Sequence, residues 1–222
     1  MGTFKHPSVI AGTGYPLHGD AIRVYLRGFY EVETVGHTIW QDGLAELDRQ
    51  MLLTKPVAII VDDTFPYPPQ EVARRVKTKL PACGLIYVDA SPNIFRVLHC
   101  LEQGFVAYLF LGDQLSESLK LVVDMARRGE RFLSPHVLGQ YERYTMYRGL
   151  FTSLPKALLT IFKLMGEGLS VQQIVGRTGL RPEVIYRRQY RLRQHFGVES
   201  NEALLEVIQG VFEDTATALA KP

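Results

Sequence analysis

Five short runs of β-branched and aromatic residues recur along the first part of the chain, and each is followed by a segment with helical spacing. The runs occupy 8–12, 30–36, 56–62, 83–89 and 105–111. The segments after them place apolar residues three and four positions apart, as amphipathic helices do. Parallel strands need a crossover connection, which is usually a helix. The alternation therefore predicts an α/β fold built on a doubly wound, five-stranded parallel sheet.

The chain changes character after about residue 133, where strand-like runs stop and only helical patterns follow. Ser170 and Gln173 form a capping-box pattern before one short helix, and Pro182 opens the next helix as a first-turn proline. Gly197 ends that helix, and Ser200 is placed to cap the last one. We predict an α/β domain at 1–133, a partly helical linker at 134–153 and an all-α domain at 154–222.

The composition is that of an ordinary globular protein. The 222 residues are 46% hydrophobic and 22% charged, and the net charge is +2. Cys83 and Cys100 have neither a second cysteine nor a histidine at metal-ligand spacing, so we expect buried thiols and neither a metal nor a cofactor. No apolar run approaches the roughly 20 residues of a membrane helix. The expected location is the bacterial cytoplasm, without membrane contact.

The most strongly charged part of the chain lies between Arg177 and Phe196, which contains six arginines and one acidic residue, Glu183. Helical spacing places apolar side chains and one glutamine on one face of this segment, and Arg187, Tyr190 and Arg191 on the other. A short helix, a tight turn and a second helix with an arginine- and tyrosine-rich outer face form a helix-turn-helix pattern. Such a face suits double-stranded DNA. The alternative is a solvated basic helix without a ligand.

A second candidate site is the stretch "AIIVDDTFPYP" at 58–68, in which a buried strand runs into Asp62 and Asp63. Open α/β sheets place their reactive groups at the carboxyl ends of strands. The two carboxylates are therefore candidates for phosphoryl or metal chemistry. The alternative is that they end a strand in solvent.

The C-terminal pattern resembles the DNA-binding domain of LuxR-type regulators of the NarL class, without a gap from Leu154 to Leu205. "GLSVQQIVGRTGL" stands where that family enters its helix-turn-helix, and "FGV" (196–198) follows the recognition helix. The usual Ser-x-x-Thr-Val-Lys is replaced by Arg181 to Tyr186, and the family's early Glu is Leu158, which implies a different operator. The resemblance implies base-reading residues and phosphate-contacting residues. The former are Tyr186, Arg187 and Tyr190, and the latter are Arg188 and Arg191.

The N-terminal half is similar to the receiver domain of two-component response regulators. "RGERFLSPHV" (128–137) resembles the end of NarL-class receivers, and Asp62 with Pro66 matches the phosphoacceptor and the proline four residues later. Receivers also use an acidic pair that holds Mg²⁺, a hydroxyl and a lysine to stabilise the phosphoryl group. Here the corresponding residues are Gly12-Thr13-Gly14-Tyr15, Asp89 and Leu111, while Tyr108 keeps the position of the family's switch aromatic.

These departures predict a degenerate receiver that does not use Mg²⁺-dependent phosphoryl transfer at Asp62. Asp89 adds a negative charge beside a phosphoryl group that already carries about two, and no lysine offsets it. The expected remnant is an acidic pocket that could take a small molecule or a protein effector. Its predicted residues are Gly12, Thr13, Gly14, Asp62, Asp63, Asp89, Tyr108 and Leu111.

The resemblance also implies a homodimer on an inverted-repeat operator, because receivers of this class commonly pair through their first and fifth helices. These helices are expected at about 18–28 and 114–127. RNA polymerase is a possible further partner. Candidate interface residues, each of which could instead belong to the core of its own monomer, are Val24, Leu26, Leu119 and Val122.

Three other functions compete with a phosphorylation-independent DNA-binding regulator. The first is a conventional response regulator that is phosphorylated on Asp62. The second is a nucleotide-dependent enzyme, for which "AGTGYPLHG" (11–19) offers a weak glycine-rich loop and Glu33 a ribose ligand. The third is a protein-interaction adaptor whose helix-turn-helix no longer reads DNA. The arginine-rich helix argues against the adaptor, and Pro16 within the loop argues against the enzyme.

Overall fold

The computed structural model describes residues 6–36 and 43–212, apart from the side chains of 146–152 and 209–212. The chain divides into two compact units, Met1–Leu138 and Gly139–Pro222, and each is described by itself. No helix in the described ranges is long and apolar enough to cross a lipid bilayer.

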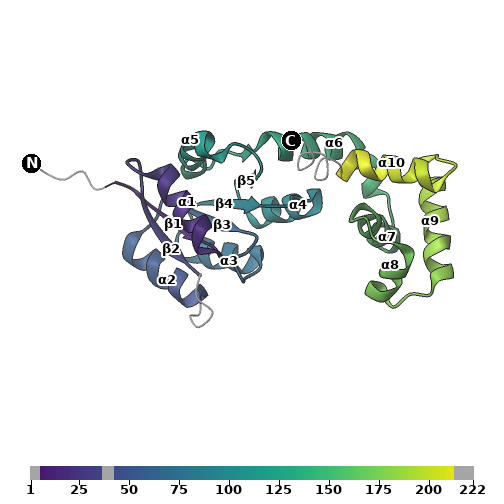
Figure 1. The fold of residues 1–222 in the computed structure, drawn as a ribbon, viewed down its shortest axis with the longest axis horizontal. Coiled ribbons are helices and arrows are strands. Elements are labelled where there is room, and N and C mark those ends of the chain that lie inside the picture. The colour runs from purple at the N-terminus through teal and green to yellow at the C-terminus, as the bar shows by residue number, and fades with distance from the viewer. Residues whose placement is uncertain (1–5, 37–42, 213–222) are drawn as a thin grey trace, which may run out of the picture. The chain divides into compact units, whose positions relative to one another are not determined.

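The first unit is a parallel sheet with helices on both faces, which confirms the predicted α/β class (Figure 1). The sheet has six strands in the order β2-β1-β3-β4-β5-β6. The strands are β1 (Ser8–Gly12), β2 (Glu31–Val35), β3 (Ala58–Asp62), β4 (Gly84–Asp89), β5 (Ala107–Phe110) and β6 (Phe132–Leu133). The helices are α1 (Pro16–Leu26), α2 (Gly43–Thr54), α3 (Pro69–Lys79), α4 (Ile94–Gln103) and α5 (Leu115–Arg127).

The sequence predicted five strands, and the sixth is the addition. β6 has two residues and pairs in parallel with β5, with Phe132 opposite Ala107 and Leu133 opposite Tyr108. A run of two residues carries no periodicity that a sequence pattern could reveal. These two residues form a strand because the adjacent strand β5 provides hydrogen-bond partners for their backbone.

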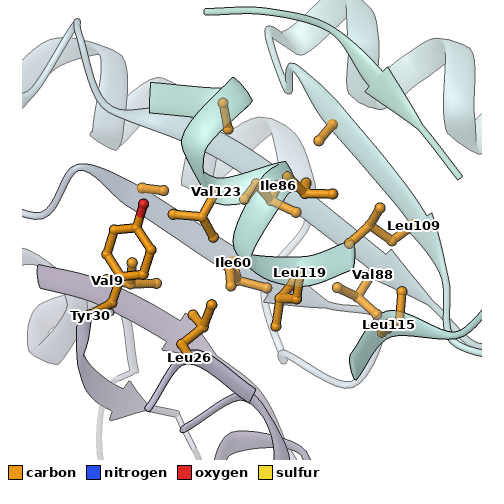
Figure 2. Close-up of a cluster of buried hydrophobic side chains, with 14 residues drawn as sticks. Val9, Leu26, Tyr30, Ile60, Ile86, Val88, Leu109, Leu115, Leu119 and Val123 are labelled. Atoms are coloured by element: carbon orange, nitrogen blue, oxygen red, sulfur yellow. The ribbon is translucent and has the colours of Figure 1, made fainter. Parts of the chain in front are cut away.

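The two faces of the sheet are covered by different helices. α1 and α5 contact each other and the same face, whereas α3 contacts both α2 and α4 on the other side. Alternate residues of the central strands, such as Val9, Ile60 and Val88, point toward α1 and α5 and form one buried cluster with Leu26 and Leu119 (Figure 2). Because side chains alternate along a strand, the residues between them face α2, α3 and α4.

Three of the four candidate dimer residues belong to this core. Leu26, Leu119 and Val122 are buried within the unit, and Val24 alone is exposed. The structure therefore assigns the first three to the core of their own monomer, which is the alternative that the sequence left open. Their spacing fits the inward face of an amphipathic helix, and the sequence pattern alone does not separate that face from an interface.

The second unit consists of helices. α6 (Pro135–Thr152) begins in the first unit and continues into the second, so the expected linker is almost wholly helical. It is followed by α7 (Lys156–Gly166), α8 (Val171–Thr178), α9 (Pro182–Phe196) and α10 (Asn201–Phe212). α7 contacts both α9 and α10, and α8 contacts α9.

The helix ends predicted in this unit are confirmed. Ser170 and Gln173 form a complete capping box on α8, and Pro182 occupies the first turn of α9. Ser200 accepts a hydrogen bond from the Ala203 amide at the start of α10. Gly179 and Gly197 end their helices with φ of +67°, a left-handed conformation that suits glycine. Gly179 and Pro182 bound the short turn between α8 and α9.

Candidate functional site

Asp62 lies at the carboxyl end of β3 and is almost fully enclosed by hydrogen-bond donors. Its Oδ2 accepts a hydrogen bond from Thr13 Oγ1 at 2.6 Å and contacts His18 Nδ1 at 2.7 Å. Its Oδ1 accepts from the hydroxyl of Thr64 at 2.6 Å and from the Thr64 amide at 3.0 Å. Only 4% of the residue is exposed. Both carboxylate oxygens are therefore already used within the protein.

His18 is the partner that sequence reasoning missed. It lies in the first turn of α1, and its imidazole forms an edge contact with the Tyr15 ring. The cation of receivers is a lysine at the position of Leu111, and a histidine in α1 is not part of that pattern. A lone histidine after a strand gives no signal of its own, so only the packing of α1 on the sheet places the ring beside Asp62.

The glycine-rich loop between β1 and α1 is packed against the loop after β3. The Gly14 amide donates to Thr64 Oγ1 at 2.8 Å, and the Tyr15 amide donates to Thr13 Oγ1 at 3.0 Å. A Cβ on Gly14 would lie 2.3 Å from the Thr64 carbonyl oxygen. These amides are occupied, whereas a phosphate loop presents free amides to its ligand. The geometry disfavours the nucleotide-dependent alternative.

Asp89 belongs to a separate polar cluster on the opposite face of the sheet. It is fully buried at the end of β4. Asp62 of β3 pairs with Val88, the residue before Asp89 in β4. Because side chains alternate along a strand, the carboxylates of Asp62 and Asp89 point to different faces of the sheet. Asp89 Oδ2 contacts Arg96 Nη1 at 2.9 Å and accepts a hydrogen bond from the Tyr108 hydroxyl. Its Oδ1 accepts from the Ser91 amide at 2.9 Å.

The Asp89 cluster corrects the expectation that Asp89 adds an uncompensated negative charge. The Arg96 guanidinium, in the first turn of α4, offsets this charge directly. Tyr108 is fully buried, and burial, followed by the nearby Asp89 charge, raises the pKa of its hydroxyl far above the usual value. The hydroxyl therefore remains protonated and acts as a donor.

Asp63 lies between these two sites at the rim of the sheet. Its Oδ2 accepts a hydrogen bond from the Ala90 amide at 3.2 Å. Partial burial is the main cause that raises the pKa of its carboxyl above the usual value, and the charges of Asp89 and Asp62 add to the effect. In the described parts of the chain, no three His, Cys, Asp or Glu side chains converge in a way that could hold a metal ion.

A cavity opens between α1 and α5, next to Asp62. Of the eight predicted pocket residues, Asp62 and Leu111 line it, while Gly12, Thr13, Gly14, Asp63, Asp89 and Tyr108 do not. Alternation along β4 and β5 directs Asp89 and Tyr108 to the other face of the sheet, so the structure does not bring all eight residues to this cavity. The remaining lining residues are His18, Ala21, Ile22, Tyr25, Val88, Asp113, Gln114, Leu115, Ser116 and Leu119.

The second candidate site is the outer face of α9 in the helical unit. Ile185, Gln189 and Leu192 are buried against the rest of the unit, as their spacing predicted. Tyr186 and Tyr190 are 56% and 53% exposed on the opposite side. One face of this helix therefore anchors it, and the other presents aromatic and basic groups to solvent.

The arginines of this segment have different surroundings. Arg177 pairs with Glu167, while Arg193 donates to Asn201 and lies over the Tyr190 ring, 5.5 Å from its centroid. Arg187, Arg188 and Arg191 share a hollow with Val184 and the start of α7, lined there by Pro155, Ala157 and Leu158. In the hollow, Arg188 also donates to the Ala157 carbonyl oxygen at 3.4 Å.

This arrangement divides the exposed face of α9 into two flanks. We call Arg187, Arg188 and Arg191 the arginine flank, and Tyr186 and Tyr190 the tyrosine flank. The arginine flank concentrates positive charge around one hollow that also includes the N-terminal end of α7. Guanidinium groups gathered in this way can bind the oxygens of an anion such as phosphate.

No protein-family model and no curated protein sequence matches the chain. Solved structures share its fold. One described as a DNA complex of the two-component response regulator RcsB has 16% identity and a TM-score of 0.59, and the match covers 93% of this chain and 100% of that one. A structure of two RcsB dimers on parallel DNAs has 18% identity, the same TM-score and the same coverage.

A third similar structure is RcsB from Salmonella enterica serovar Typhimurium, bound to the P1flhDC promoter in the presence of the phosphomimetic BeF3⁻. Its identity is 17% and its TM-score 0.58, and the match covers 93% of this chain and 100% of that one. At these identities the likeness establishes the fold, which combines a receiver-like α/β unit with a helical unit. The first unit is called the receiver-like unit below, and the second the helical unit.

Proposed function

We propose that this chain is a sequence-specific DNA-binding transcriptional regulator that acts as a dimer and does not depend on phosphorylation of Asp62. The observation that carries the proposal is the α9 helix, with one face buried and the other presenting the arginine and tyrosine flanks. The fold is shared with response regulators whose solved structures contain DNA. The proposed domains are 1–133, 134–153 and 154–222, with α6 as the helical connector.

The two flanks support a division of labour on a duplex. A recognition helix in the major groove has base edges in front of it and a phosphate backbone on each side. Tyr186, Tyr190 and Arg187 are proposed to read bases, and Arg188 and Arg191 to contact phosphates. Because Arg187 lines the same hollow as the other two arginines, its role is the one that most needs a test.

The first experiment selects binding sites from random duplexes with the full chain and then measures two variants over a range of salt concentrations. We expect Arg191→Ala to weaken binding to all sequences and to reduce the slope of log affinity against log salt by about one. If Arg187 reads a base, Arg187→Ala will cost about 1–3 kcal/mol at one position of the site and relax selectivity there. Arg128→Ala is the charge-matched control, because Arg128 lies outside the helical unit and pairs with Glu130.

The DNA proposal fails if Arg187→Ala combined with Tyr190→Ala leaves both affinity and selectivity unchanged while circular dichroism shows a folded chain. That result would favour the adaptor alternative. It would also mean that the basic face of α9 is only a solvated surface.

Independence from phosphorylation is supported by the surroundings of Asp62. A phosphoacceptor carboxylate needs one oxygen free to attack and a cation to offset the developing charge. Here Thr13, His18 and Thr64 occupy both oxygens. The negatively charged Asp113 faces the same cavity, which Leu111 lines at the position of the receiver lysine.

The second experiment incubates the full chain with acetyl phosphate and Mg²⁺ and measures its intact mass. We expect no stoichiometric addition of a phosphoryl group, and no change of DNA affinity with BeF3⁻ and Mg²⁺. A conventional two-component receiver run in parallel is the positive control. Modification of Asp62, or a Mg²⁺-dependent gain in DNA affinity, would overturn independence from phosphorylation and leave the DNA-binding proposal intact.

A further inference from the structure

The cavity between α1 and α5 has the properties of a small-molecule site. Its volume is about 210 Å³, and it lies beside Asp62 at the carboxyl edge of β3. Its apolar lining includes Ile22 and Tyr25 of α1, Leu115 and Leu119 of α5, and Val88 of β4. Figure 2 shows Val88, Leu115 and Leu119 next to one another at one end of the buried cluster. The body of a ligand here would contact mainly apolar side chains.

Among the charged and titratable groups that line the cavity, acidic groups outnumber basic ones. Asp62 and Asp113 contribute carboxylates, and the lining contains neither lysine nor arginine. His18 is the one basic residue in the lining, and its Nδ1 already contacts Asp62. Like charges in a partly desolvated site repel strongly, so an anionic ligand is disfavoured and a cationic one favoured.

Asp113 is the carboxylate available to such a cation. Asp62 has four polar contacts at 2.6 to 3.0 Å, with Thr13, His18 and Thr64, whereas among the described residues Asp113 Oδ2 accepts one long hydrogen bond, 3.4 Å, from the His136 amide. Asp113 is half-buried directly before α5, where it lines the cavity. A charged donor that reached it would therefore form a new charge-assisted hydrogen bond without displacing a strong one.

The volume sets the size of the ligand. An apolar cavity of about 150 Å³ is enough to hold benzene. A cavity of about 210 Å³ has room for one aromatic ring with a short substituent. In such a ligand, a chain of two carbons would link a ring packed between α1 and α5 to a polar group at the carboxylates of the cavity.

We propose that this cavity binds a small aromatic amine, with its ring between α1 and α5 and its ammonium group on Asp113. Binding does not depend on the proposed DNA activity, since the whole cavity lies within the receiver-like unit. A failure of one proposal is therefore distinguishable from a failure of the other.

The test titrates the full chain by calorimetry with three probes of similar size, namely phenethylamine, 2-phenylethanol and 3-phenylpropionate. We expect the amine to bind with 1:1 stoichiometry, the alcohol at least tenfold more weakly, and the carboxylate not measurably. Equal affinity for all three probes, or no binding of the amine, would overturn the proposal.

Variants locate the binding site. Ala21→Leu and Ser116→Leu add bulk from α1 and from α5 respectively, so either one that remains folded is expected to weaken amine binding at least tenfold. Ala82→Leu adds the same bulk in the exposed turn before β4, outside the cavity, and should leave binding unchanged. Asp113→Asn should remove the preference for the amine over the alcohol. Amine binding that survives the cavity-filling changes, or a preference that survives Asp113→Asn, would place the amine elsewhere and overturn the assignment.

Discussion

Asp62 and Asp89 show how one residue's position along a strand determines its chemistry. Both end central strands, yet Asp62 faces α1 and α5 while Asp89 faces the side that α4 covers. Asp62 is held by two threonines and a histidine, and Asp89 by an arginine, a tyrosine and an amide. A shift of one residue along the pleat would exchange these surroundings.

Tyr108→Phe tests the Asp89 cluster. The change removes the donor to a fully buried carboxylate, while Arg96 and the Ser91 amide remain. We expect the free energy of unfolding of the receiver-like unit to fall by about 1–3 kcal/mol, measured by urea denaturation. Tyr25→Phe is the matched control, since Tyr25 is 40% exposed and its loss of a hydroxyl should change stability by less than about 0.5 kcal/mol. Equal effects of the two changes would show that the Tyr108 hydroxyl contributes no net stability.

At the scale of the element, the ends of α8 and α9 are determined by residues at or next to those ends in the sequence. The capping box, the first-turn proline and the two left-handed glycines each act within a few residues of the chain. Together they fix where α8 and α9 each start and stop. The exposed face of α9 then follows from which residues α7, α8 and α10 bury.

Ser170→Ala is expected to lower the free energy of unfolding of the helical unit by about 1 kcal/mol, because it removes the acceptor for the Gln173 amide. Thermal unfolding followed by circular dichroism measures the change. Gln172→Ala, at an exposed position of the same turn, is the control and should have an effect within about 0.5 kcal/mol. If the two variants unfold alike, the capping box contributes nothing beyond helix propensity.

At the scale of the whole molecule, exposed apolar residues of α1 and α5 are candidates for the interface of the proposed dimer. Leu17 and Val24 are seven residues apart on α1, so they lie on one stripe of that helix, and both are largely exposed. Leu121 of α5 is also exposed, by 54%. Exposed apolar side chains on two contacting helices suit an interface between copies of the chain, although the buried residues proposed from the sequence do not take part.

We expect the full chain to be a dimer at micromolar concentration in light scattering, and Val24→Arg to convert it to a monomer by placing a charge on this surface. Affinity for an inverted-repeat site should then fall at least tenfold, because the second half-site no longer gains from linkage. Leu52→Arg, at a comparably exposed leucine of α2, should change neither property. A wild-type chain that stays monomeric with and without DNA would refute the dimer.

Most of the fold could be predicted from the sequence, because strand and helix periodicities and helix caps act over a few residues. The order of strands and helices, the end of α9 at Gly197 and the buried face of that helix were all predictable in this way. β6 and the continuity of α6 through the partly helical linker were not, because two residues carry no period and α6 has almost no amphipathic pattern.

The candidate sites also differ in how far the sequence alone could predict them. The basic face of α9 lies on one helix, so spacing alone indicated it. The surroundings of Asp62 depend on His18, which is 44 residues away in the chain, and those of Asp89 on the face to which β4 turns it. The sequence by itself determined the elements and the exposed charge on them. Only the tertiary structure decided which carboxylate meets which partner, since side chains from separate loops meet only after the sheet and its helices have packed.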